Sequence, residues 1–195
     1  MNLPNLLSLL RIILTPLFII LLFSESSSNR IFALIVFAVA AITDAYDGHL
    51  ARKYNLITPE GKFLDPLADK ILVLSAFFSF AFIGIIDFWM VWIISFRDLF
   101  ITGLRLIISS KGFEFVTSNL SKYKTAFQLT IIILTLIFLT IEGLNIDQLI
   151  PTLDLIKDYK IIYILTMFTA IFTAYTGIIY LYTNRIVIKD FINNS

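Results

Sequence analysis

The chain has no cysteine and only one histidine, His49, in 195 residues. The absence of cysteine excludes a disulfide framework and a thiolate metal site, so any metal must be held by oxygen ligands or by that one imidazole. Charged residues are also scarce, at 15%, and the formal net charge of +1 leaves no basic patch. Nucleic acid is therefore not an expected partner.

Hydrophobic residues make up 58% of the chain, well above the composition of an ordinary soluble domain. They gather in six runs of about 20 residues, each the length of one bilayer crossing. Because a backbone in hydrocarbon must satisfy its own hydrogen bonds and no period-2 pattern is present, we predict an all-α integral membrane protein without strands. One domain over 1–195 is expected. The predicted transmembrane helices are Leu6–Phe23, Ile31–Arg52, Pro66–Ile86, Phe88–Ile108, Tyr123–Ile141 and Ile161–Thr183.

Lysine and arginine concentrate in alternate connections between these runs. The second and fourth connections and the C-terminal tail are the basic ones, whereas the fifth connection is acidic and is expected on the opposite surface. The positive-inside rule then predicts that both termini are cytoplasmic, with the protein in the inner (cytoplasmic) membrane. Lys111–Leu120 is predicted to be a short interfacial helix or an ordinary loop. The first run is not expected to be a cleaved signal, because Arg11 and Pro16 lie inside it.

Four carboxylates stand at the cytoplasmic ends of the second and third predicted helices. Asp44 and Asp47 are three positions apart and Asp65 and Asp69 four, so each pair shares one helix face. These helices are antiparallel neighbours, which places both pairs at the same end of the bundle. Clustered carboxylates repel one another unless cations neutralise them, and an oxygen-only ligand set suits magnesium or manganese. A pair of such ions also organises phosphoryl transfer.

Small residues border the acidic cluster. Gly48 and Ala51 lie about one turn beyond the first two carboxylates, where larger side chains would keep a nucleotide away from the helix backbone. Arg52 is placed to meet a phosphate. The whole pattern, Asp-x2-Asp-Gly-x2-Ala-Arg-x8-Gly-x3-Asp-x3-Asp, resembles the signature of the CDP-alcohol phosphotransferase family. The matching residues are Asp44, Asp47, Gly48, Ala51, Arg52, Gly61, Asp65 and Asp69.

The resemblance implies a six-helix fold, a homodimer, and a reaction in which a hydroxyl attacks the β-phosphorus of a CDP-linked donor and CMP leaves. It implies two Mg²⁺ or Mn²⁺ ions in each site, held by Asp44, Asp47 and Asp65. Asp69 would ligate metal or act as the general base. Asn5, Ser8 and Arg11 step by three along the first helix, which is expected to help line the donor site. The residues expected to contact the CDP donor are Asn5, Asp44, Asp47, Gly48, Ala51, Arg52 and Gly61.

A cluster of cations is expected to select the acceptor. Arg97 and Arg105 are about two helical turns apart, so they share a face. With Lys124 they offer three positive charges to a dianionic phosphate, which suits glycerol 3-phosphate better than serine or free inositol. The surrounding sequence resembles that of bacterial phosphatidylglycerophosphate synthases, which implies CDP-diacylglycerol as the donor. Two residues depart from that pattern: Asp98 stands where glutamate is usual, and Ser121 where glycine is.

Other interpretations stay open on the residues alone. The carboxylates could form structural ion pairs with nearby cations such as Lys70, and the three acceptor-site cations could be interfacial anchors. Arg11 either faces the donor site or snorkels to the interface. The same metal chemistry could serve inositol phosphate, serine or phosphatidylglycerol as the acceptor. An ion-coupled transporter, in contrast, would place its charges near the membrane midplane.

Overall fold

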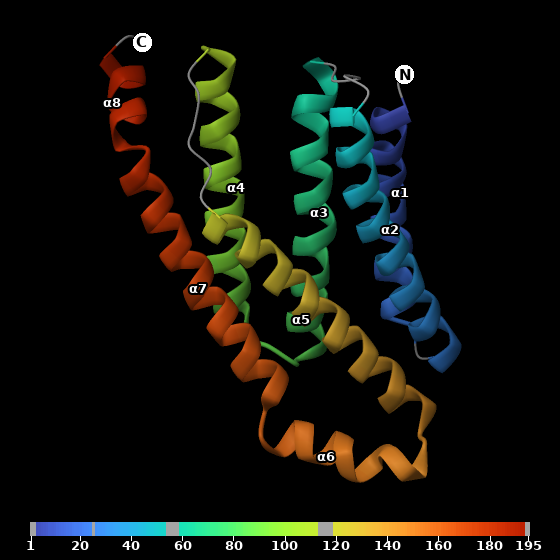
Figure 1. Cartoon of the computed structure of the whole chain (residues 1–195). Coiled ribbons are helices and arrows are strands. Elements are labelled where there is room, and N and C mark those ends of the chain that lie inside the picture. Colours follow the sequence, from blue (N-terminus) through green and yellow to red (C-terminus); the bar gives the residue numbers. More distant parts are fainter. Residues whose placement is uncertain (1–2, 25, 54–58, 113–118, 194–195) are drawn as a thin grey trace.

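The computed structural model describes residues 3–24, 26–53, 59–112 and 119–193, and for residues 3–5, 44–53, 59–66 and 119 it describes the backbone alone. The described part of the chain is helical apart from short connections and contains no strand. Figure 1 shows the helices side by side in one bundle. In chain order they are α1 (Leu3–Leu22), α2 (Ser27–Lys53), α3 (Pro59–Ile83), α4 (Phe88–Ser110), α5 (Asn119–Leu144), the 3₁₀ helix η1 (Asp147–Leu149), α6 (Ile150–Asp158), α7 (Ile161–Thr183) and α8 (Arg185–Asn193).

Each predicted apolar run falls in one long helix, and the predicted all-α fold is confirmed. The largest difference is at the start of α3, which begins at Pro59 and not at Pro66. Proline suits the first turn of a helix because its missing N–H has no partner there in any case. The helix therefore extends beyond its apolar part. Of the segment predicted as a short helix or loop, Lys111 and Gly112 form a turn and 113–118 lie outside the described residues.

Within the described residues, two helices are long and apolar enough to cross a membrane, over Leu120–Leu144 and Ile161–Thr183. Two further apolar stretches, Leu6–Leu22 and Ser27–Thr43, are shorter. α4 has a comparable length of 23 residues but carries Arg97, Asp98 and Arg105. Charged side chains within an apolar helix are costly in lipid, so they are expected to point toward the other helices.

Helix packing follows the buried faces. α1 packs against α2 and α3, α4 packs against α3 and α7, and α5 packs against α2 and α7. Phe18 of α1 and Phe37 of α2 are both fully buried, with ring centroids 5.4 Å apart. Aromatic rings in such contact add stabilisation beyond the apolar area that they bury. The arrangement leaves α3, α4, α5 and α7 around the site described below.

The buried face of α1 is partly polar. Ser8, Arg11 and Thr15 are buried at helical spacing with Phe18. Arg11 is 1% exposed, so the alternative in which it snorkels to the interface is wrong. The side chain of Asn5, predicted to share this face, lies outside the described residues.

The acidic fifth connection forms η1 and α6, which bridge the ends of α5 and α7 (Figure 1). α6 buries Leu153 against the bundle and leaves Leu155 exposed. At the other end of the bundle, α1 begins and α8 ends (Figure 1). The first and last helices therefore start and finish on the same side.

Candidate active site

The acidic cluster is placed by the backbones of α2 and α3. Asp44 and Asp47 lie in the C-terminal part of α2, and Asp65 and Asp69 lie in the N-terminal part of α3. Both segments are helical, so each pair has the spacing of one helix face. α2 and α3 contact each other, and the C-terminal end of α2 and the N-terminal end of α3 lie at the same end of the bundle (Figure 1). The backbone arrangement thus agrees with the predicted convergence.

For most signature residues the structure describes the backbone alone. They are Asp44, Asp47, Gly48, Ala51, Arg52, Gly61 and Asp65. Their assignment to metal and donor remains a prediction. The chemistry of this donor set is all-oxygen, which fits Mg²⁺ or Mn²⁺.

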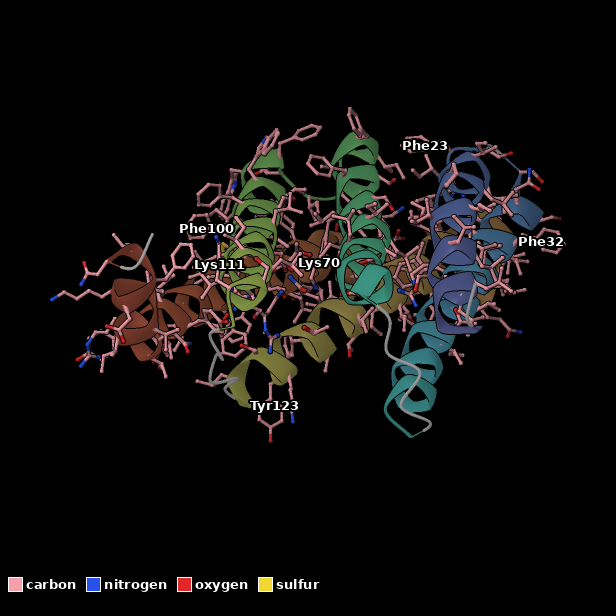
Figure 2. All side chains as sticks on the ribbon, turned by 90° about the horizontal axis from the view of Figure 1, so that it is seen from above. Phe23, Phe32, Lys70, Phe100, Lys111 and Tyr123 are labelled. Atoms are coloured by element: carbon pink, nitrogen blue, oxygen red, sulfur yellow. The ribbon has the colours of Figure 1, made fainter. Side chains whose placement is uncertain are left out.

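Asp69 is the signature carboxylate whose surroundings are described. Its side chain is 23% exposed, and its Oδ2 accepts a hydrogen bond from Nζ of Lys70 at 2.8 Å. The Lys70 ammonium also lies 3.9 Å from Oδ2 of Asp98 in α4. Figure 2 shows Lys70 pointing into the interior of the bundle, whereas Tyr123 points outward. Lys70 therefore lies between Asp69 and a second carboxylate.

That second carboxylate, Asp98, is the centre of a buried polar cluster. It is 1% exposed, and both of its oxygens accept hydrogen bonds from Nζ of Lys124 in α5. It also accepts hydrogen bonds from Nη1 of Arg97 at 3.2 Å and from Nε2 of Gln128 at 3.4 Å. A buried carboxylate is tolerated only when cations and donors compensate its lost hydration, and here they come from α4 and α5, with Lys70 of α3 nearby.

A cavity of about 200 Å³ opens beside this cluster. Arg97 and Arg105 from α4 and Lys124 from α5 all line it, so the structure brings together the three predicted acceptor-site cations. The charged side chains of its lining are Asp69, Lys70, Arg97, Arg105 and Lys124, and the hydroxyl-bearing ones are Thr102, Ser121, Thr125 and Tyr180. One cavity therefore joins Asp69 of the acidic signature to the cations predicted to bind the acceptor.

The three cations differ in their freedom to bind a ligand. Lys124 is 1% exposed and its ammonium is held by Asp98. Arg105 is exposed. Arg97 bonds Asp98 through Nη1, and its buried Nε and Nη2 have no hydrogen-bond partner among the described residues. Two of its nitrogens are therefore left for a ligand in the cavity.

Among the side chains that the structure describes, the charges around the cavity sum to an excess of two positive charges. Four cations, namely Lys70, Arg97, Arg105 and Lys124, stand against the carboxylates of Asp69 and Asp98. Such an excess matches a dianionic phosphate. Sequence reasoning treated Lys70 only as a partner in structural ion pairs and Asp98 only as a departure from a pattern. A carboxylate in the middle of an apolar helix is itself the signal that could have found Asp98.

Residues 1–175, which include α1 to α6 and most of α7, match the family described as CDP-alcohol phosphatidyltransferase. The chain belongs to the CDP-alcohol phosphatidyltransferase family. This membership confirms the resemblance seen in the acidic signature.

Relatives of this chain within the family are named for the same reaction. A CDP-diacylglycerol–glycerol-3-phosphate 3-phosphatidyltransferase of Rickettsia bellii is 35% identical over 175 residues, which cover 90% of this chain and 92% of that protein. The Bacillus subtilis protein of the same name is 39% identical over 64% of this chain and 70% of its own length. A probable phosphatidylglycerophosphate synthase of Mycobacterium tuberculosis is 41% identical over 57% of this chain. The chain spans about half of that mycobacterial protein, at 54%.

Proposed function

We propose that this chain transfers a phosphatidyl group from CDP-diacylglycerol to glycerol 3-phosphate, which yields phosphatidylglycerophosphate and CMP. The observation that carries this proposal is the cavity shared by Asp69 and the cations Arg97, Arg105 and Lys124. The names of the relatives in Rickettsia bellii and Bacillus subtilis support the same donor and acceptor.

The cations of the cavity orient the acceptor. The free donors of Arg97 and the exposed guanidinium of Arg105 would hold the phosphate of glycerol 3-phosphate through charge-assisted hydrogen bonds. Lys124, held by Asp98, contributes a fixed positive charge at the cavity wall. With the phosphate held there, the glycerol hydroxyl lies on the side of Asp69, which brings nucleophile and base together.

Asp69 is assigned as the general base. Its carboxylate accepts the proton of the attacking glycerol hydroxyl, whose oxygen forms a bond to the β-phosphorus of the donor. The bond from that phosphorus to the CMP oxygen breaks, and CMP carries away the electron pair. Lys70, at 2.8 Å, orients the carboxylate toward the cavity.

The remaining signature residues are assigned to the donor. Asp44, Asp47 and Asp65 would hold two Mg²⁺ or Mn²⁺ ions. Ions bound there would neutralise charge on the donor diphosphate. Gly48, Ala51, Arg52 and Gly61, with Asn5 from α1, would accommodate the CDP moiety.

The proposal also includes a placement in the bilayer. The six long helices would cross the inner membrane, with both termini and the active site on the cytoplasmic side and with two chains forming a homodimer. The common side on which α1 begins and α8 ends supports an even number of crossings (Figure 1). The basic connections between the helices support the cytoplasmic assignment.

CMP release tests the proposal. The full chain, purified in detergent, is supplied with CDP-diacylglycerol, Mg²⁺ or Mn²⁺ and one acceptor at a time: glycerol 3-phosphate, serine, inositol phosphate or phosphatidylglycerol. We expect release with glycerol 3-phosphate and little with the others. Release with serine or inositol phosphate instead would overturn the acceptor assignment alone, whereas no release with any acceptor would overturn the reaction.

A further inference from the structure

A second polar cavity lies far from the candidate active site. It has a volume of about 460 Å³ and lies between the α3–α4 turn, the end of α5, α6 and the start of α7. Gly84 in that turn borders open space, because a Cβ built on it would meet no atom within 4 Å. Glu142 on this cavity is 18 residues beyond Lys124 in α5, about 27 Å along the helix. That distance approaches the thickness of the bilayer core, so the two cavities lie at opposite ends of one crossing.

A third cavity adjoins the second and has a different character. It has a volume of about 220 Å³ and is lined almost entirely by apolar side chains of α5, α6 and α7, such as Leu134, Leu153 and Leu165. Phe138, Ile156 and Ile162 line both cavities. A charged cavity and an apolar one therefore share a wall of three residues, which is the arrangement that an amphiphilic ligand needs.

The charged cavity carries both signs. Glu142 and Lys157 are paired at 2.7 Å. Asp87 accepts hydrogen bonds from the Tyr163 hydroxyl at 2.7 Å and from Trp89 Nε1 at 3.2 Å, and both donors use its Oδ2. Among the described residues Lys160 has no ion-pair partner.

These charges select the class of ligand. Two lysines and two carboxylates make the cavity neutral as a whole, yet Lys160 offers an unpaired cation and Asp87 has an oxygen that neither Tyr163 nor Trp89 uses. A headgroup with a phosphodiester and an ammonium complements this pair, whereas a purely anionic headgroup would leave Asp87 opposed to like charge.

We propose that the two adjoining cavities bind one zwitterionic glycerophospholipid from the bilayer leaflet opposite the active site. Its phosphodiester lies against Lys160 and its ammonium against Asp87. One of its acyl chains occupies the apolar cavity between α5, α6 and α7. Such a lipid would stabilise the packing of α6 against the bundle at the membrane boundary.

The test is native mass spectrometry of the full chain in detergent, titrated with dioleoylphosphatidylethanolamine or dioleoylphosphatidylglycerol. Lys160→Glu reverses the charge that holds the phosphate, and it is expected to weaken binding of the ethanolamine lipid about fivefold. Its control is Lys189→Glu, which makes the same charge change on exposed α8. Thr152→Trp fills the apolar cavity and is expected to abolish the lipid adduct. Its control is Thr130→Trp, at an exposed position of α5 outside both cavities.

Two results would overturn the proposal: equal binding of both lipids by the unmodified chain, or equal affinities in the Lys160→Glu and Lys189→Glu variants. Because both lysines are exposed, these variants are expected to fold and to decide the question even if Thr152→Trp does not fold. CMP release should be unchanged in both lysine variants, which separates this result from the test of the proposed function.

Discussion

Arg97 of α4 passes so close to Gly177 of α7 that a Cβ on the glycine would lie 2.8 Å from Cγ of the arginine and 3.4 Å from its Nε. The distance to Cγ is shorter than a normal van der Waals contact, whereas the distance to Nε is an ordinary one. Because Gly177 has no side chain, Arg97 has room to extend past α7 into the cavity. Gly177 contributes to the candidate acceptor site without lining it.

Gly177→Ala is expected to displace Arg97. The methyl group would collide with the root of the arginine side chain and not with its flexible end, so overpacking should lower stability by about 1–3 kcal/mol. The displaced guanidinium would also raise KM for glycerol 3-phosphate. Thermal unfolding in detergent and CMP-release kinetics measure the two effects.

The matched control is Gly103→Ala in α4, where an added Cβ would meet nothing within 4 Å. That variant should be as stable as the unmodified chain or slightly more stable, because alanine favours the helix. If the two alanine variants behaved alike, the contact between Gly177 and Arg97 would have no role.

Asp98→Asn tests the buried carboxylate. Asparagine has a similar shape but cannot compensate the ammonium of Lys124, and breaking one side of a buried ion pair costs about 3 kcal/mol or more. We therefore expect a large fall in the unfolding temperature. The fluorescence of Trp89 and Trp92 measures it. Asp98→Glu keeps the charge and should lose much less. An asparagine variant as stable as the unmodified chain would show that the charge of Asp98 is not needed.

The helices were predictable because their cause is local. A run of about 20 apolar residues is sufficient to predict a long helix, and each run falls in one long helix. The start of α3 was misplaced because Pro59 and the residues after it are too polar to be read as part of an apolar run, although they form helix. Hydrophobicity marks the part of a helix that lipid or core can cover, and the helix itself can continue beyond it.

The candidate site was predictable to the extent that it depends on spacing within a helix. Arg97 and Arg105 share a cavity as their separation predicted. The roles of Lys70 and Gly177 depend on how α3, α4 and α7 pack, which no local pattern contains. The burial of Lys124 against Asp98 likewise depends on a contact between α4 and α5 through two residues that are 26 positions apart in sequence.

Arg105→Gln is expected to weaken binding of the acceptor. The substitution removes the most exposed of the predicted phosphate ligands, and a charge-assisted hydrogen bond contributes enough to change KM for glycerol 3-phosphate about tenfold or more. KM for CDP-diacylglycerol should change little. Lys111→Gln, an exposed position at the end of the same helix, is the control. Equal effects of Arg105→Gln on both substrates would argue against its acceptor role.

Removal of divalent cations should abolish CMP release, because without them nothing neutralises the repulsion between the clustered carboxylates and the donor diphosphate. Addition of Mg²⁺ or Mn²⁺ should restore it. A readout independent of activity is the binding of Mn²⁺ followed by electron paramagnetic resonance, which Asp44→Asn and Asp47→Asn should weaken. Full turnover in excess chelator would contradict the metal assignment.

Asp69→Asn tests the general base without changing the cations that are proposed to bind the acceptor. The amide cannot accept the hydroxyl proton, so kcat should fall about 100-fold or more, while KM for glycerol 3-phosphate should stay close to its normal value because Arg97 and Arg105 are untouched. Lys70→Met is the informative companion. It leaves the Asp69 carboxylate in place but removes the ammonium 2.8 Å away that orients it, so a smaller fall in kcat is expected. If Asp69→Asn kept full turnover with normal Mn²⁺ affinity, the proton would have to leave by another route, and the base role would pass from Asp69 to another carboxylate of the signature.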